Sequence, residues 1–242
     1  MEHEDLRESG PGGASCQTAP VNIGVLGATG PAGRGIAARL ASVGHAVTVG
    51  SREQSRSEAV VAELRDEWGP RVDTLDAGTN EDAAKADDLV VIATIWDAAV
   101  DTAATHADAL AGKPVIAMAN GLEKVGREFR PVLPAAGSVS QAIQHAAPAA
   151  RVVAGFHLVP ASALADLDRP LESDIILCAD DDDARRVVLE LVTGIPELRA
   201  FDGGSLVNAV GLEAFAAVLL TVNLRHKGKG ALRLLGVEGY RP

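Results

Sequence analysis

Three glycines at positions 27, 30 and 33 are spaced for contact with a phosphate group. They lie in the segment Gly27-Ala28-Thr29-Gly30-Pro31-Ala32-Gly33, directly after an apolar run and before an amphipathic one. In a strand–turn–helix unit with this spacing, the first glycine permits a tight turn, the second lets the backbone approach a pyrophosphate, and the third lets the helix pack closely on the strand. Free backbone N–H groups and the helix dipole then face the anion. An ordinary glycine-rich loop is the alternative, but we predict a dinucleotide site formed by Gly27, Thr29, Gly30, Pro31, Ala32 and Gly33.

The end of the second predicted strand indicates which dinucleotide is bound. An NAD site usually has Asp or Glu there to hold the ribose 2′-hydroxyl, whereas an NADP site needs cations and hydroxyls for the 2′-phosphate. This chain has Ser51 and Arg52 at that place, with Arg56 one helical turn further on. A guanidinium forms charge-assisted hydrogen bonds with a phosphate. We predict an NADP(H) site that uses Ser51, Arg52 and Arg56, with Glu53 pointing away; a surface arginine cluster is the alternative.

The elements that position these residues alternate regularly between residues 21 and 117. The predicted strands and helices are strands 21–26, 46–49, 72–75, 89–93 and 114–117, helices 33–43, 55–68 and 98–110, and a further helix with Asn80 as its N-cap. Such alternation indicates a parallel sheet with right-handed crossovers. We therefore predict an α/β fold, a Rossmann doubly wound parallel sheet with a smaller C-terminal α+β domain.

The regular alternation ends at about residue 150. The later elements are predicted as strands 152–156, 175–178 and 198–201, a helix 183–192, and a long apolar helix 206–224. We expect this last helix to be mostly buried, in part at a subunit interface, which favours a homodimer. Residues 1–20 are rich in charge, Gly, Ser and Pro, and are predicted to be a disordered tail. The expected domains are residues 1–20, a dinucleotide-binding domain over 21–150 and a C-terminal domain over 151–242.

Composition limits the partners and the location. A net charge of −11 and only 3% aromatic residues argue against nucleic acid as a partner, because neither phosphate neutralisation nor base stacking is favoured. The acidic start is unlike a secretory signal, and we expect no segment apolar enough to span a membrane. Cys16 and Cys178 lie far apart in the sequence, which favours a reducing cytoplasm. No histidine shows metal-ligand spacing, so we predict no metal site.

Five short segments occur in the order found in one known family. They are residues 25–30 (Val-Leu-Gly-Ala-Thr-Gly), 49–52 (Val-Gly-Ser-Arg), 80–83 (Asn-Glu-Asp-Ala), 156–161 (Phe-His-Leu-Val-Pro-Ala) and 178–182 (Cys-Ala-Asp-Asp-Asp). Through these segments the chain resembles the NADPH-dependent F420 reductases, also called F420:NADP oxidoreductases. The resemblance extends from about residue 21 to about residue 235. The His-X-X-Pro-Ala segment combined with the Gly-Ser-Arg strand end is a fairly specific signal.

The resemblance implies hydride exchange between C4 of the nicotinamide and C5 of the 8-hydroxy-5-deazaflavin coenzyme F420. Direct transfer needs two rings held close together with water excluded, and little acid–base machinery, because the chemistry belongs to the cofactors. This agrees with a chain that has no evident Ser/His/Asp or Tyr/Lys constellation, and we predict no catalytic side chain. By the same resemblance, the remaining cofactor-binding residues are Trp96 and Ala161 beside the nicotinamide, and His157, Val159, Pro160 and Leu232 beside the deazaflavin.

Two of these assignments have structural alternatives. A hydrogen bond between His157 and the deazaflavin ring is expected, because negative charge develops on that ring during reduction. His157 would otherwise satisfy backbone groups at a turn, and Trp96 would otherwise be a core residue. The basic run of Arg225, Lys227, Lys229 and Arg233 is expected either to meet the anionic tail of F420 or to be a solvated helix end.

Two other functions are compatible with the same sequence. One is an NADPH-dependent reductase of a different acceptor, such as an imine, a flavin or a ferric chelate. The other is a regulator that senses NADP without turnover. The His-X-X-Pro-Ala segment and the apolar C-terminal helix are more than a sensor requires, so we favour an enzyme.

Overall fold

The computed structural model describes residues 19–242, so residues 1–18 of the predicted tail lie outside the described residues. Eight strands form one sheet in the order β3-β2-β1-β4-β5-β8-β9-β10. All neighbouring strands are parallel except β8 and β9, which are antiparallel. The strands are β1 (Asn22–Leu26), β2 (Ala46–Ser51), β3 (Leu75–Thr79), β4 (Leu89–Ile92), β5 (Pro114–Ala117), β8 (Arg151–Ala154), β9 (Ser173–Ala179) and β10 (Leu198–Asp202). This order confirms the predicted doubly wound Rossmann-type fold.

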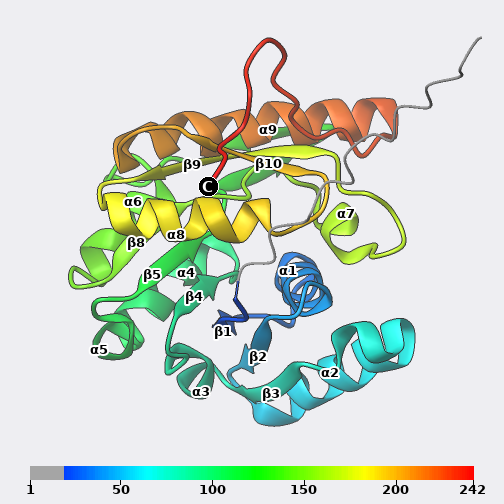
Figure 1. The fold of residues 1–242 in the computed structure, drawn as a ribbon. Coiled ribbons are helices and arrows are strands. Elements are labelled where there is room, and N and C mark those ends of the chain that lie inside the picture. Colours follow the sequence, from blue (N-terminus) through cyan, green and yellow to red (C-terminus); the bar gives the residue numbers. More distant parts are fainter. Residues whose placement is uncertain (1–18) are drawn as a thin grey trace, which may run out of the picture.

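Helices cover both faces of the sheet (Figure 1). On one face lie α1 (Pro31–Ser42), α2 (Gln54–Trp68), α7 (Ala161–Ala165) and α8 (Asp182–Thr193). On the other face lie α3 (Asn80–Ala84), α4 (Trp96–Thr105), α5 (Ala107–Leu110), α6 (Val139–Ala146) and the start of α9 (Ala209–His226). Among the described residues, both apolar clusters are built mostly from aliphatic side chains, and Phe156 is the one buried residue among Phe, Trp and Tyr.

Several sequence-based boundaries in the first half were wrong. The third strand was expected over 72–75, but β3 begins at Leu75, which pairs with Val47; Val72 ends a short 3-10 helix, η1 (Gly69–Val72), and its buried side chain gave the apolar signal. The N-cap of α3 is Thr79 and not Asn80, because Thr79 forms a reciprocal capping box with Asp82. The helix expected over 98–110 begins earlier, at Trp96, and is divided into α4 and α5.

The sequence-based prediction also lacked one hairpin and two helices. They are the hairpin of β6 (Leu122–Val125) and β7 (Glu128–Pro131), the helix α6, and the short helix α7. The hairpin strands are only four residues long and mostly exposed, so they lack the apolar alternation by which strands are recognised. Residues 151–242 contribute β8, β9 and β10 to the one sheet, together with α9; the expected division near residue 150 stays a prediction.

Within this single chain the long C-terminal helix is mostly not buried, and its expected burial at a subunit interface stays a prediction. Only Ala209, Glu213, Ala216 and Ala217 of α9 are buried. The segment Leu206–His226, which includes the 3-10 helix η2 (Leu206–Asn208), contains an 18-residue stretch with a mean hydropathy of 1.7 and is long and apolar enough to cross a membrane by length and composition alone. The expectation that no segment reaches this limit was therefore wrong. A single helix of this kind is weak evidence for a membrane span.

Candidate functional site

The glycine-rich turn connects β1 to the start of α1. Gly27 has a φ of +74°, and a Cβ there would lie 2.4 Å from Cγ2 of Thr94, so only glycine fits. A Cβ at Gly33 would lie 2.6 Å from Cα of Ala28, which shows how closely α1 packs on the turn. Gly30 is the N-cap of α1 and Pro31 its first residue, with no side chain capping this end and no acidic residue in the first turn. The first N–H groups of α1 are therefore left for an anion.

A first hollow of about 330 Å³ connects this turn with the end of β2. It brings together six of the residues assigned to NADP(H) binding, namely Gly27, Thr29, Gly30, Ser51, Arg52 and Arg56. Ser51 is buried and its hydroxyl accepts a hydrogen bond from the backbone N–H of Glu53 at 3.4 Å. Glu53 does not line the hollow, but its carboxylate lies 3.2 Å from Nε of Arg56. Arg52 is thus the cation of this hollow without a carboxylate partner among the described residues.

Asn80 also lines the first hollow, and the sequence analysis did not assign it to the site. Its side-chain Oδ1 accepts a hydrogen bond from the N–H of Gly27 at 3.1 Å. The polar residue directly after β3 therefore holds the first residue of the phosphate turn, while Thr79 caps the helix. The available sequence signal was Thr79, a second residue able to cap the helix, which leaves the side chain of Asn80 for another contact.

A second hollow of about 290 Å³ adjoins the first at the carboxyl ends of β4 and β5. It shares Gly30, Ala93, Thr94 and Ile95 with the first hollow, and it adds the predicted residues Pro31, Ala32 and Trp96. Trp96 is partly buried and packs on the apolar cluster below, so it is both a cleft wall and a core neighbour. Ile95 leaves 71% of its surface exposed at the edge of this hollow.

A third hollow of about 180 Å³ lies between the 156–161 segment and α9. It contains the predicted residues His157, Val159, Pro160 and Ala161, and it shares Ala32, Met118 and Asn120 with the second hollow. The three hollows therefore adjoin one another in a series from Arg52 to α9, here called the track. Leu232 does not line this track; its carbonyl accepts a hydrogen bond from the N–H of Asp174 at 2.9 Å.

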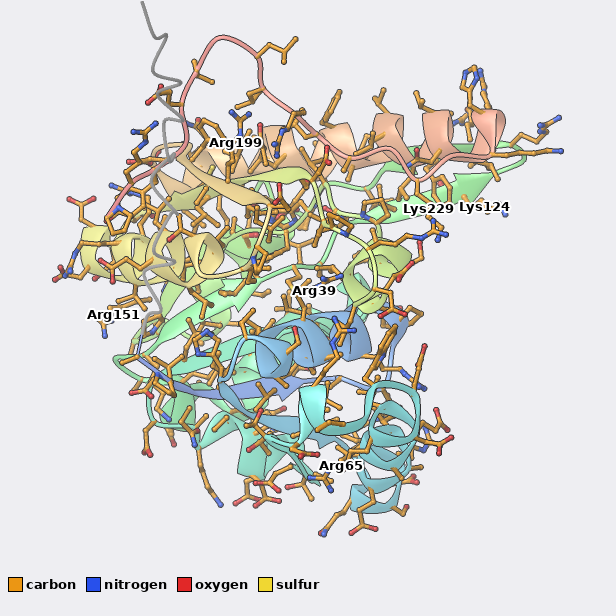
Figure 2. All side chains as sticks on the ribbon, turned by 45° about the vertical axis from the view of Figure 1, so that its right-hand side comes forward. Arg39, Arg65, Lys124, Arg151, Arg199 and Lys229 are labelled. Carbon is orange, nitrogen blue, oxygen red and sulfur yellow. The ribbon has the colours of Figure 1, made fainter. Side chains whose placement is uncertain are left out.

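Helix α1 holds the 156–166 segment in place. Arg39 of α1 is buried within the molecule (Figure 2). It donates hydrogen bonds to the carbonyls of Ala163, Leu164 and Asp166, at 2.9, 3.2 and 2.6 Å. At Gly35 a Cβ would lie 2.9 Å from Cβ of Leu164, so α1 and α7 approach closely. The helix that begins at the phosphate turn thus also positions the wall of the third hollow.

His157 is buried, and burial lowers the pKa of its imidazole to about 4. Its Nδ1 lies 3.0 Å from Oδ1 of Asn120, and its carbonyl accepts a hydrogen bond from Nδ2 of Asn120 at 3.1 Å. Its Nε2 is buried and has no partner. The imidazole therefore does not satisfy backbone groups at the turn, which was the alternative to a ligand contact. Asn120 was not identified from the sequence, where a single Asn in a loop gives no signal.

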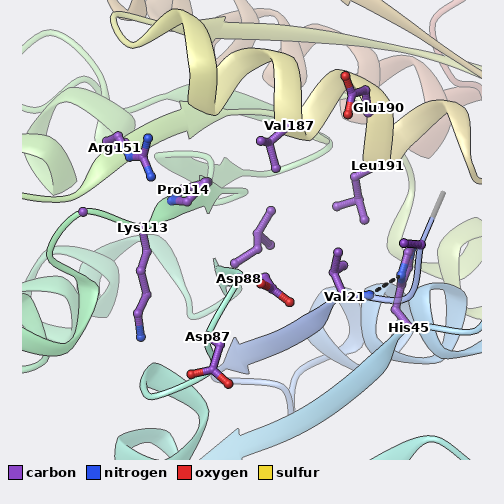
Figure 3. A pocket seen from close by; sticks show the side chains of 13 residues that line it. Val21, His45, Asp87, Asp88, Lys113, Pro114, Arg151, Val187, Glu190 and Leu191 are labelled. Atoms are coloured by element: carbon purple, nitrogen blue, oxygen red, sulfur yellow. Dashed lines mark hydrogen bonds between the residues drawn. The ribbon is translucent and has the colours of Figure 1, made fainter. Parts of the chain in front are cut away.

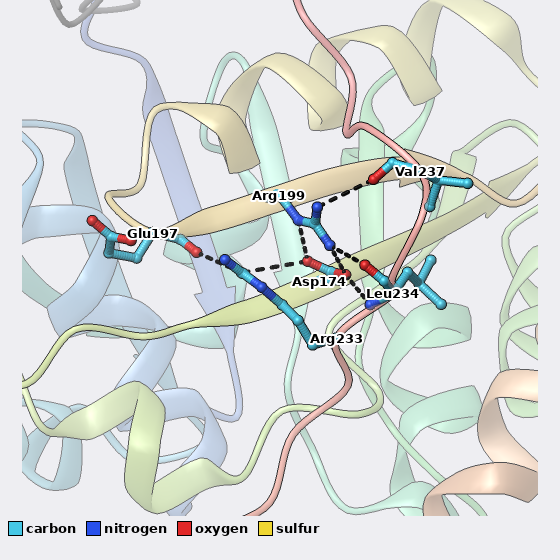
Figure 4. Close-up of polar contacts among 6 residues, drawn as sticks. All are labelled: Asp174, Glu197, Arg199, Arg233, Leu234 and Val237. Atoms are coloured by element: carbon cyan, nitrogen blue, oxygen red, sulfur yellow. Dashed lines mark hydrogen bonds and ion pairs between the residues drawn. The ribbon is translucent and has the colours of Figure 1, made fainter.

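The C-terminal segment is attached to the sheet by a buried carboxylate (Figure 4). Asp174 of β9 pairs with Arg199 at 2.6 Å and with Arg233 at 3.5 Å, and it accepts a hydrogen bond from the N–H of Leu234. Two residues of the basic run that was expected to meet the F420 tail already have acidic partners. Arg233 pairs with Asp174, and Arg225 lies 3.5 Å from a carboxylate oxygen of Glu128. Within residues 19–242, no ion pair involves Lys227 or Lys229.

A larger hollow, of about 550 Å³, lies at the amino ends of the strands (Figure 3). Its wall includes Val21, Leu89, Pro114 and Arg151, which are at or next to the amino ends of β1, β4, β5 and β8. Ligands of doubly wound sheets bind beyond the carboxyl ends of the strands. We therefore assign the candidate site to the track of three smaller hollows, which contains the phosphate turn.

Comparisons with known proteins agree with this geometry. A family model described as NADP oxidoreductase coenzyme F420-dependent matches residues 22–121. The F420-dependent NADP reductase of Methanocaldococcus jannaschii is 30% identical over 224 residues, which cover 90% of this chain and 100% of that protein. The enzyme of the same name from Methanothermobacter thermautotrophicus is 29% identical over 215 residues, covering 87% of this chain and 93% of that protein.

The fold also has a close structural relative. A crystal structure from Arthrobacter sp. FB24, provisionally described as an F420-dependent NADP reductase, superposes with a TM-score of 0.74 at 27% identity, covering 86% of this chain and 96% of that chain. The sequence similarity extends over both the phosphate turn and the 156–161 segment, so the resemblance inferred from short motifs is confirmed. The chain belongs to the family of F420-dependent NADP reductases.

Proposed function

We propose that this chain transfers a hydride between NADP(H) and coenzyme F420. The observation on which this depends is the continuity of the three hollows: Gly30 and Ile95 belong to the first and second, and Asn120 to the second and third. A dinucleotide along the first two hollows and a deazaflavin in the third would bring their rings together beside Ala32, Met118 and Asn120. A hydride then leaves C4 of the nicotinamide and bonds to C5 of the deazaflavin, and a proton from water balances the reduced ring.

The residues of the first hollow supply dinucleotide selectivity. The start of α1 offers backbone N–H groups to the diphosphate, and Arg52 offers a guanidinium to the 2′-phosphate. Ser51 adds a hydroxyl beside it. Arg56 contributes less than Arg52, because Glu53 already neutralises part of its charge. NADP(H) is thus the expected dinucleotide.

The residues of the second and third hollows hold the rings and exclude water. Trp96 and Ala161 would border the nicotinamide, and His157, Val159 and Pro160 would contact the deazaflavin. Apolar side chains of α9 form the remaining wall of the third hollow. Leu232 would not contact the deazaflavin directly; its carbonyl accepts a hydrogen bond from the N–H of Asp174, which shares a small hollow with His157. Orientation and exclusion of water are what direct hydride transfer requires of a protein.

Absorbance of the deazaflavin gives a direct test. Purified protein is mixed with F420 and either NADPH or NADH, and with NADPH plus a flavin, an imine or a ferric chelate. The proposal predicts rapid loss of deazaflavin absorbance with NADPH, much slower loss with NADH, and no comparable turnover of the other acceptors. NADPH binding without any turnover would instead favour an NADP sensor.

We also propose that the chain forms a homodimer through α9. Phe215, Val218 and Val222 follow one another at three- and four-residue intervals, so they share one face of α9, and exposed Val207 lies in η2 just before this helix. Each leaves between 43% and 54% of its surface exposed. A contiguous apolar face of this kind is uncommon on a monomer and is typical of an interface. A second copy of the same helix offers a self-complementary partner for it.

A further inference from the structure

Asn120 contacts His157 through both ends of its amide group. Nδ2 of Asn120 donates to the carbonyl of His157 at 3.1 Å, and Oδ1 lies 3.0 Å from Nδ1 of the imidazole. A carbonyl only accepts hydrogen bonds, so the amide nitrogen must face it and the amide oxygen must face Nδ1. An amide oxygen also only accepts, so Nδ1 must hold the proton. The contact therefore fixes the tautomer of the imidazole.

The fixed tautomer leaves a lone pair on Nε2. Burial lowers the pKa of His157 to about 4, so the ring is neutral near pH 7. Nε2 is buried without a partner among residues 19–242, and His157 lines both the third hollow and a small hollow that it shares with Asp174. The ionisable side chain that shares a hollow with His157 is Asp174, and its carboxylate is already paired with Arg199 and Arg233. His157 thus offers an acceptor, and a buried acceptor without a partner is costly unless a ligand supplies a donor.

The backbone next to His157 is strained. Phe156 has a φ of +63°, a left-handed conformation that a bulky residue rarely adopts. With the backbone turned in this way, the carbonyl and the imidazole of His157 both contact the side chain of Asn120. Asn120 itself lies where the second and third hollows meet. Both the strained turn and the paired contact therefore lie where the two rings would meet.

We propose that Asn120 is a positioning residue, which holds His157 in the Nδ1–H tautomer so that Nε2 accepts a hydrogen bond from a ring N–H of the deazaflavin. The imide N–H of its pyrimidinedione ring is a group of this chemistry. The inference deepens the proposed function and rests on it. It also replaces the expectation that His157 donates to a ring with developing negative charge: the imidazole accepts from an N–H donor, and would disfavour a ring that presents only acceptors or a methylated nitrogen.

Nitrogen NMR of the ligand-free enzyme tests the tautomer without any turnover. Protein labelled with ¹⁵N-histidine is compared with Asn120→Ala, and His157→Gln identifies the signals of His157 among those of the other histidines. We expect the Nδ1–H tautomer in the wild type between about pH 5.5 and 8, and a shift towards Nε2–H in Asn120→Ala. A wild-type His157 that is protonated at Nε2 would overturn the inference, whether or not the enzyme reduces F420.

Steady-state kinetics test the contact with the deazaflavin. Asn120→Ala is expected to raise the KM for F420 about three- to tenfold, the value of one hydrogen bond. Asn120→Asp retains an acceptor for Nδ1–H but places a negative charge beside the ring, which favours the imidazolium. Its KM for F420, relative to wild type at each pH, should rise as the pH falls below about 7, because protonated Nε2 no longer accepts. A constant ratio across pH would contradict the proposal.

Two controls separate this inference from its alternatives. Asn208→Ala removes an exposed side chain that donates to the carbonyl of Gly203, far from the hollows in sequence and contacts, and should leave the KM unchanged. A deazaflavin methylated at the imide nitrogen should be a poorer substrate than F420 for the wild type. The difference between the two substrates should be smaller for Asn120→Ala. Failure of the wild type to reduce F420 would contradict the proposed function, whereas normal reduction of the methylated analogue would contradict only the role of Asn120 and His157.

Discussion

The side-chain Oδ1 of Asn80 accepts a hydrogen bond from the backbone N–H of Gly27 at 3.1 Å. This contact joins the start of α3 to the first residue of the phosphate turn, across 53 positions of sequence. A Cβ at Gly50, at the end of β2, would lie 3.0 Å from the same oxygen. The ends of β1, β2 and β3 are therefore packed around one amide side chain, which shapes the floor of the first hollow.

Replacing Asn80 should weaken dinucleotide binding. Asn80→Ala leaves the N–H of Gly27 without a partner and frees the turn, and an unsatisfied buried donor costs about 1–3 kcal/mol. We expect the Kd for NADPH, measured by titration calorimetry, to rise about tenfold, while NADH binding weakens by a similar factor because the turn serves both. A folded Asn80→Ala protein with wild-type affinity would show that the contact does not support the turn.

Replacing Arg52 should change selectivity instead. Arg52→Gln removes the cation of the first hollow that has no carboxylate partner among the described residues, and a charged hydrogen bond contributes about 1.5–3 kcal/mol. The Kd for NADPH should therefore rise at least tenfold (on the order of 1.5 kcal/mol or more), with little change for NADH. Arg241→Gln, at an exposed arginine paired only with Glu238, is the matched control. Equal losses of affinity for NADPH and NADH would show that Arg52 does not contact the 2′-phosphate.

Much of the fold was predictable from the sequence because its signals are local. The apolar run of β1, the glycine spacing and the amphipathic start of α1 occur within adjacent residues, so periodicity and spacing reveal them. The Gly50-Ser51-Arg52 strand end was informative for the same reason. The shift of β3 shows the limit of such reasoning, since Val72 is as buried as Leu75 although it belongs to η1.

The missing parts of the site depend on contacts between distant residues. Asn80 and Gly27 are 53 positions apart, and Asn120 and His157 are 37 apart. Neither asparagine differs in sequence from an ordinary capping or loop residue, so only the folded arrangement shows what it binds. The extent of the exposed face of α9 could not be predicted for a related reason: hydropathy indicates that a helix avoids water, but not how much of it its own chain covers and how much is left for a second chain.

A charge on the exposed face of α9 should separate the two subunits. Val218→Asp places a carboxylate in the middle of the apolar face, where burial against a second copy would be costly. We expect the wild type to sediment as a dimer and Val218→Asp as a monomer at the same micromolar concentration. Val237→Asp, at an equally exposed valine outside α9, should remain dimeric. A wild type that sediments as a monomer at micromolar concentrations would contradict the proposed dimer.

The buried carboxylate of Glu213 should make stability depend on pH. Glu213 of α9 accepts hydrogen bonds from the N–H groups of Val139 and Ser140 and from the hydroxyl of Ser140, and so caps α6. Burial raises its pKa above the ordinary value of 4.5, although these hydrogen bonds oppose the shift. Between 4.5 and the raised pKa, the folded state binds more protons than the unfolded state, so the free energy of unfolding falls as pH rises.

Urea unfolding of Glu213→Gln measures this effect. The variant cannot titrate at this position, so its free energy of unfolding lacks the pH-dependent part. We expect the wild type to lose stability relative to Glu213→Gln as the pH rises from about 4.5, with the loss complete once Glu213 is ionised in the folded state. Glu58→Gln, at an exposed glutamate of α2, should follow the wild-type profile. A wild type that instead gains stability over Glu213→Gln with rising pH would mean that the three hydrogen bonds outweigh burial, because a depressed pKa gives the opposite slope.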